Sequence, residues 1–163
     1  DGNGRIGRLL ITLYLVSVGL LKKPSLYLSA FFEKHKSSYY DALTHVRHTS
    51  DVIHWIKFFL SAIIETAKKG KETFTQILAL KNEIHQLIIT FGKKAENAQK
   101  LVNYLYANPI VNLADVMGAT DLSKQASNQL IKDFLNKKIL VELTGNQRNR
   151  LFYFKTYYDL FIV

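Results

Sequence analysis

Apolar residues recur every three or four positions through most of the first ninety residues, which is the spacing of one face of an α-helix. This spacing predicts helices over about 5–21, 25–47, 52–64 and 72–91. Lys22-Lys23-Pro24 ends the first of them, because proline cannot continue the helical hydrogen bonds and restricts the residue before it. Apolar side chains nearly surround this first helix, so we expect it in the interior of a helical bundle.

The pattern changes at Ala95. A helix ends before the turn at Asn108-Pro109, a short helix begins after Asn112, and a longer helix covers about 123–136. Two β-prone runs, ILVELT and RLFYFK, follow with a hairpin turn between them. This order of helices and strands is typical of a winged helix-turn-helix.

Charge and composition narrow the classes of function. The 163 residues carry a formal charge of +9, which favours phosphate-containing or nucleic-acid partners. Residues 1–100 hold 15 basic against 8 acidic side chains, whereas residues 101–163 hold 7 against 5. The absence of cysteine excludes disulfides and favours a reducing, cytoplasmic setting. No apolar run reaches the roughly 20 residues of a membrane span, so we expect no membrane partner.

The first eight residues, DGNGRIGR, carry the strongest chemical signal. Gly2 and Gly4 allow unusual backbone dihedrals, so that amides converge at a helix start, where an anion is favoured. Arg5 and Arg8 lie three positions apart and suit phosphate oxygens, while Asp1 adds a carboxylate of the kind that holds Mg²⁺ beside phosphates. The segment therefore indicates a site for Mg²⁺ and a polyphosphate; a plain turn followed by solvated arginines is the structural alternative.

The same segment resembles the active-site motif of the Fic family, which reads His-Pro-Phe, any residue, Asp or Glu, then Gly-Asn-Gly-Arg, two free positions and Arg. Asp1, Gly2, Asn3, Gly4, Arg5 and Arg8 match its last fixed positions in order. The segments PSLYLSAFFEKHKSSYYDALTHVR and DVIHWIKFFLSAI also resemble helices that follow the motif, and the TGNQRNRLFYF ending resembles a C-terminal module of that subgroup. The resemblance implies the C-terminal part of a Fic helical bundle over 1–94 and a winged helix-turn-helix with a small β-hairpin wing over 95–163.

The family transfers a nucleotidyl group, usually AMP from ATP, to a hydroxyl of a target protein, here unknown. The resemblance implies that Asp1 binds Mg²⁺ and that Gly2, Asn3 and Gly4 form the anion nest. It also implies that Arg5 holds the outer phosphates and that Arg8 assists or receives an inhibitory glutamate. The family's general base is the motif histidine, which would lie upstream of Asp1. No catalytic residue is therefore assigned here, and we expect this chain to be a fragment that is inactive by itself.

The second part suggests a different function, DNA binding. The side chains expected to face DNA lie on the second helix of the helix-turn-helix and at the wing: Ser123, Lys124, Gln125, Asn128, Lys132, Arg148 and Arg150. The chain could thus belong to a DNA-binding regulator whose Fic-like part is a sensor or scaffold. Two further alternatives remain: a packing or protein-interaction module, since fold does not settle function, and an enzyme of the same fold with altered chemistry, such as removal of AMP.

The helix over residues 5–21 also bears on oligomeric state. Its apolar residues lie on all sides, so part of this surface stays exposed if the rest of the bundle is missing. We therefore expect self-association into a homo-oligomer.

Overall fold

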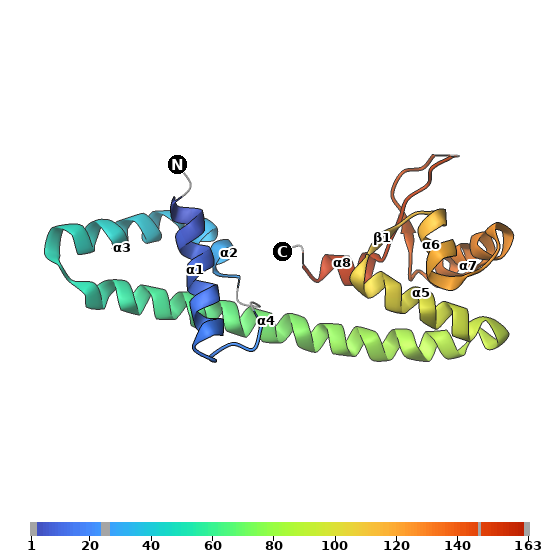
Figure 1. The fold of residues 1–163 in the computed structure, drawn as a ribbon, viewed down its shortest axis with the longest axis horizontal. Coiled ribbons are helices and arrows are strands. Elements are labelled where there is room, and N and C mark those ends of the chain that lie inside the picture. Colours follow the sequence, from blue (N-terminus) through green and yellow to red (C-terminus); the bar gives the residue numbers. More distant parts are fainter. Residues whose placement is uncertain (1–2, 24–26, 147, 162–163) are drawn as a thin grey trace. The chain divides into compact units, whose positions relative to one another are not determined.

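The computed structural model describes residues 3–23, 27–146 and 148–161. The protein is mainly α-helical with a small three-stranded antiparallel sheet (Figure 1). It forms two compact units, residues 1–72 and 73–163, which divide within a helix.

In the described residues of the first unit, all regular elements are helices. It contains α1 (Asn3–Ser17), α2 (Leu28–Lys34), α3 (Lys36–Thr49) and the first part of α4 (Val52–Ile89). Leu28 and Phe32 of α2 and Ala62 of α4 form its core. Ile11 and Leu15 of α1 pack against this core, so one face of α1 is covered by the rest of the unit.

The second unit contains the rest of α4 and, in its described residues, eight shorter elements that follow it. These are η1 (Gly92–Lys94), α5 (Ala95–Ala107), β1 (Ile110–Val111), α6 (Leu113–Thr120), α7 (Lys124–Asn136), β2 (Val141–Glu142), β3 (Phe152–Tyr153) and α8 (Lys155–Asp159). Its core includes Leu80, Ile84 and Ile88 of α4 together with Leu101 and Phe134. Because α4 contributes to this core, the second unit begins well before Ala95, where the sequence pattern changes.

The three strands are ordered β1-β3-β2, and both pairings are antiparallel. Tyr153 of β3 lies opposite Ile110 on one side and Val141 on the other. The sheet therefore joins the strand before α6 to the hairpin after α7. Asn112 caps α6: its side chain accepts hydrogen bonds from the amides of Ala114 (2.7 Å) and Asp115 (3.1 Å), which explains why α6 begins there.

Three predictions of helix boundaries are wrong. The stretch predicted as one helix over 25–47 contains two, α2 and α3, which are separated at His35. The stretches predicted as separate helices over 52–64 and 72–91 are one 38-residue helix, because Gly70 keeps a helical conformation between good helix formers. Helix α1 covers Asn3–Ser17 rather than about 5–21, so it ends before the Lys22-Lys23-Pro24 segment that was expected to end it.

Candidate functional site

The chemistry predicted for the amino-terminal segment centres on the first turns of α1. Asp1 and Gly2, predicted to bind metal and anion, lie outside the described residues. Asn3 and Gly4 belong to the helix itself, and Gly4 does not adopt a positive φ. The expected unusual backbone at Gly4 is therefore not present, because the helix already includes this residue.

The two arginines of the segment differ in their surroundings. Arg5 is exposed, whereas Arg8 is partly buried. Arg8 lines a small cavity of about 110 Å³ whose walls also include Glu33, Lys36, Tyr39 and Tyr40 from α2 and α3. Its Nε atom is buried and has no hydrogen-bond partner among the described residues. Because arginine can only donate, this atom lacks an acceptor.

Lys36 is a residue of this cavity that the sequence analysis did not identify. The sequence offers a signal, since Lys36, Tyr39 and Tyr40 are three and four positions apart and share a helix face. Nothing in the sequence shows that this face meets α1. The cavity thus combines two cationic side chains, two tyrosines and one carboxylate, Glu33.

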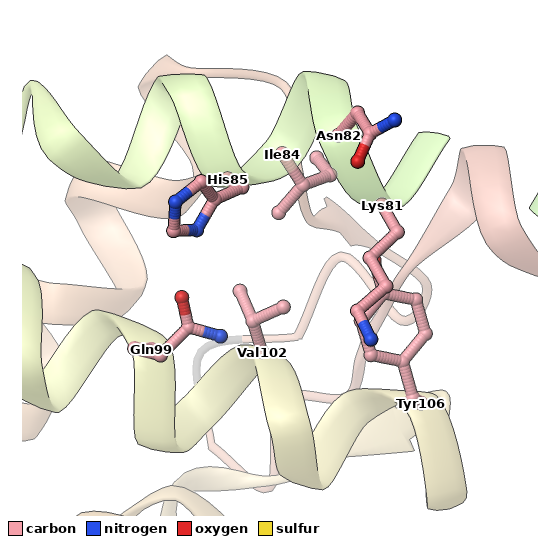
Figure 2. Close-up of a pocket in the computed structure, with 7 residues that line it drawn as sticks. All are labelled: Lys81, Asn82, Ile84, His85, Gln99, Val102 and Tyr106. Atoms are coloured by element: carbon pink, nitrogen blue, oxygen red, sulfur yellow. The ribbon is translucent and has the colours of Figure 1, made fainter. Parts of the chain in front are cut away.

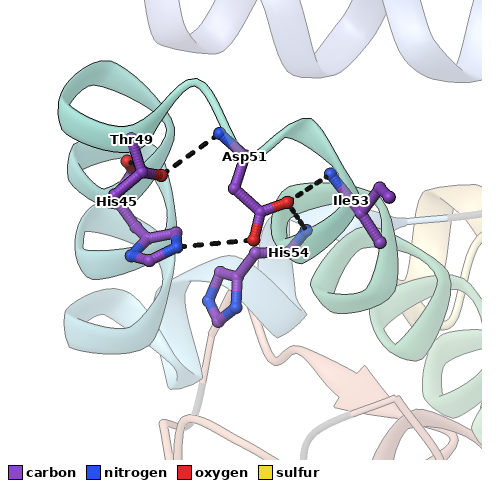
Figure 3. Close-up of polar contacts among 5 residues, drawn as sticks. All are labelled: His45, Thr49, Asp51, Ile53 and His54. Carbon is purple, nitrogen blue, oxygen red and sulfur yellow. Dashed lines mark hydrogen bonds and ion pairs between the residues drawn. The ribbon is translucent and has the colours of Figure 1, made fainter.

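A second polar cluster joins α3 to α4 (Figure 3). One carboxylate oxygen of Asp51 accepts hydrogen bonds from the amides of Ile53 (3.0 Å) and His54 (3.2 Å), and the other lies 3.5 Å from Nε2 of His45. The Thr49 hydroxyl accepts from the Asp51 amide at 3.1 Å. The His54 amide, then the Ile53 amide and His45, lower the pKa of Asp51. Because its carboxylate accepts two of the first amides of α4, Asp51 caps the amino-terminal end of this helix. Among the described residues, no group of three His, Cys, Asp or Glu side chains is placed to hold a metal ion.

Helix α7 carries most of the residues predicted to face DNA. Lys124, Gln125, Asn128 and Lys132 are all exposed. Ser123 is exposed as well, and its hydroxyl accepts a hydrogen bond from the Ala126 amide at 3.3 Å. Ser123 is therefore the N-cap of α7.

The two arginines of the β2–β3 hairpin are placed differently. Arg148 is exposed in the connection between the strands. Arg150 forms a bidentate ion pair with Glu142, with Nε 2.8 Å from Oε1, and its guanidinium lies 4.9 Å from the ring centroid of Phe152. The Glu142 carboxylate raises the pKa of Arg150, and in return Arg150 lowers that of Glu142. Arg150 is thus paired within the hairpin. Among the described residues of the hairpin, Arg148 is the basic side chain that makes no ion pair.

A groove that the sequence analysis did not predict runs along the amino-terminal half of α7. Its volume is about 460 Å³, and Lys93, Lys94 and Asn97 form the wall opposite Ser123 and Gln125. Lys94 is paired with Asp133 at 2.5 Å, whereas Lys93 is exposed and makes no ion pair within the described part of the chain. The Lys93-Lys94 dipeptide is visible in the sequence, but its closeness to α7 depends on how α5 packs.

Comparison with models of known protein families gives no match for this chain. Within the described residues, none of the helices is both long enough and apolar enough to span a membrane. Function must therefore be inferred from the chemistry of the two polar regions, the cavity at Arg8 and the surface of α7.

Proposed function

We propose that this chain is the C-terminal part of a Fic-family protein that transfers AMP from ATP to a hydroxyl of another protein. The observation that carries the proposal is the environment of Arg8, whose buried Nε finds no acceptor in the described part of the chain and which shares a cavity with Lys36. Phosphate oxygens are strong acceptors for guanidinium donors, so a nucleotide phosphate would satisfy this atom. The string from Asp1 to Arg8 supports the same ligand through its match to the family motif.

The proposed roles follow the motif. Gly2, Asn3 and Gly4 present backbone amides to phosphate oxygens, Arg5 holds the outer phosphates, and Arg8 binds an adjacent one. Asp1 would hold Mg²⁺, which usually takes one or two carboxylates together with phosphate oxygens and neutralises their charge. These residues bind and orient the ATP substrate.

In the proposed reaction the hydroxyl oxygen of the target attacks the α-phosphorus of ATP. A new oxygen–phosphorus bond forms, the bond from the α-phosphorus to the oxygen bridging to the β-phosphorus breaks, and pyrophosphate leaves. The hydroxyl proton passes to a general base, which in the family is the motif histidine. In the motif that position precedes the aspartate matched by Asp1, and the residues from Asp1 to Arg8 would bind the phosphates.

The test uses the longer protein that carries this chain, ATP labelled on the α-phosphate, Mg²⁺ and lysate of the source organism. Label should appear on protein, and Arg8→Ala should reduce the labelling rate by about tenfold or more, because a charged hydrogen bond to phosphate is lost. Arg47→Ala is the matched control, since Arg47 is an exposed arginine of α3 outside the cavity. Absence of label, or equal labelling by the Arg8 and Arg47 variants, would contradict the proposal.

DNA binding is a second candidate, favoured by the second unit. Its element order, helix, strand, helix, helix and two-stranded hairpin, with strand order β1-β3-β2, supports a winged helix. The exposed side chains of Lys124, Gln125, Asn128 and Lys132 offer phosphate and base contacts on α7. Lys93, across the groove from α7, adds a further positive charge.

Binding to a random-sequence DNA duplex, followed by fluorescence anisotropy over a range of salt concentrations, tests this second function. Affinity should fall steeply with salt, and Lys132→Gln should reduce the slope of log affinity against log salt by about 1. Lys57→Gln removes the same charge from the first unit and should leave the slope unchanged. A slope that both variants alter equally, or no binding at low salt, would exclude α7 as the DNA-binding element.

A further inference from the structure

A small polar cavity lies between α4 and α5 in the second unit. It is separate from the cavity at Arg8 and from the groove along α7. Its volume is about 100 Å³. Lys81, Asn82 and His85 come from α4, and Gln99 and Tyr106 from α5, as Figure 2 shows. The side chains of Ile84 and Val102, both almost fully buried, complete the lining and form an apolar floor.

The hydroxyl of Tyr106 is the unusual feature of this cavity. It is buried and has no hydrogen-bond partner among the described residues. The ring is fixed in place, because the rings of Phe154 and Tyr157 lie 5.7 Å and 5.2 Å from it between centroids. The Tyr157 hydroxyl also donates to the backbone carbonyl of Tyr106 at 3.2 Å. Rotating the Tyr106 side chain so that its hydroxyl reaches solvent would therefore break the ring contacts with Phe154 and Tyr157.

The protonation state of this hydroxyl makes it a donor. Burial, and next the neighbouring Tyr157, raise the pKa of Tyr106 above its ordinary value, so the phenol keeps its proton at neutral pH. A buried donor without an acceptor costs free energy, which an occupant with an acceptor oxygen would recover.

The charged side chains that line the cavity indicate the charge of its occupant. Lys81 makes no ion pair with any described residue, and the lining includes no Asp or Glu. The ammonium of Lys81 and the side chains of Asn82 and His85 can donate further hydrogen bonds. An anionic oxygen therefore gains more here than a neutral one, because hydrogen bonds to charged groups are the stronger ones.

The apolar floor indicates that the occupant also has an apolar part. We propose that this cavity binds a small carboxylate, whose oxygens accept hydrogen bonds from the Tyr106 hydroxyl and the Lys81 ammonium while its short apolar stem lies on Ile84 and Val102. A phosphate group has hydrated oxygens on every side and gains nothing from an apolar floor. The carboxylate belongs either to a free short-chain acid or to an acidic side chain of another protein. This inference does not depend on nucleotidyl transfer or on DNA binding.

A nuclear magnetic resonance titration of the full ¹⁵N-labelled chain with sodium propionate tests the proposal, with sodium chloride at equal ionic strength as the reference. The side-chain amide signal of Asn82 and the backbone signals of Gln99 and Val102 should shift and saturate. Lys81→Gln and Tyr106→Phe should each weaken binding by about tenfold or more. Lys69→Gln, which removes an exposed charge elsewhere on α4, should leave the affinity unchanged.

Three outcomes would overturn the proposal: shifts that follow chloride without saturating, equal affinity in the Lys81 and Tyr106 variants and the unchanged chain, or inorganic phosphate binding as tightly as propionate. Lys81 is exposed, so its variant keeps the test valid even where Tyr106→Phe disturbs folding. A parallel titration with N-acetylglutamate α-amide, which carries a side-chain carboxylate, separates the two sources. Tighter binding of propionate supports a free acid, and tighter binding of the blocked glutamate supports a protein side chain.

Discussion

At the scale of single residues, the ion pair between Lys94 and Asp133 links η1 to α7, with 2.5 Å between Nζ and Oδ2. The Gln129 side chain donates to the other carboxylate oxygen at 3.0 Å. Burial alone would raise the pKa of Asp133, but the hydrogen bonds from Lys94 and Gln129 and the charge of Lys94 lower it below its ordinary value. Because the folded pKa is the lower one, the unfolded chain binds more protons near pH 4.

Asp133 should therefore stabilise the second unit above the pKa of the unfolded carboxyl, near 3.9, and lose this contribution as pH falls through its folded pKa. The contribution should be less than about 1 kcal/mol, since Lys94 is half exposed. Urea unfolding at pH 7 and pH 3 measures it: Asp133→Asn should lower the free energy of unfolding at pH 7, and this difference should shrink at pH 3. Asp121→Asn serves as the control, because Asp121 is an exposed carboxylate at the C-cap of α6. A difference that is the same at both pH values would contradict this assignment.

At the scale of elements, the continuity of α4 depends on Gly70. The glycine has a helical backbone, and a Cβ atom built on it meets nothing within 4 Å. Gly70→Ala should thus stabilise the protein by about 1 kcal/mol, because alanine has a higher helix propensity and restricts the unfolded chain. Gly92, which follows α4, has a φ of +57°, so Gly92→Ala should destabilise the protein despite the open space around it.

Thermal unfolding of the two glycine variants beside the unchanged chain gives the comparison. A higher melting temperature for Gly70→Ala with a lower one for Gly92→Ala supports a continuous α4. Destabilisation by both substitutions would mean that the helix is interrupted at Gly70, which would agree with the two separate helices predicted over 52–64 and 72–91.

The elements also show what the sequence could and could not predict. Local chemistry located the cap at Asn112 and the hairpin after α7, because capping and turn residues act within a few positions. It failed at Gly70, where the cost of a glycine is smaller than the gain from a long helix packed on two cores. It also missed Lys36 beside Arg8 and Lys93 beside α7, since both placements depend on tertiary packing.

At the scale of the whole molecule, the outer face of α1 bears on association. Its inner face packs on the core of the first unit through Ile11 and Leu15. The side chains on the other face are between 47% and 65% exposed: Ile6, Leu9, Leu10, Leu13 and Tyr14. The sequence-based prediction of exposed apolar surface on this helix is therefore confirmed, whereas the association expected from it remains a prediction. An exposed apolar stripe of this kind favours contact with another apolar surface.

The chain should self-associate through this face, since covering it removes apolar surface from water. Sedimentation velocity over a range of protein concentrations should show a mass that increases with concentration. The double variant Leu9→Glu/Leu13→Glu should remain a monomer, because each glutamate would have to be desolvated in the interface. Leu143→Glu changes a comparably exposed leucine of the hairpin and should associate like the unchanged chain. A monomer at every protein concentration would contradict self-association of the chain. Loss of association in Leu143→Glu alone would place the contact in the second unit instead of on α1.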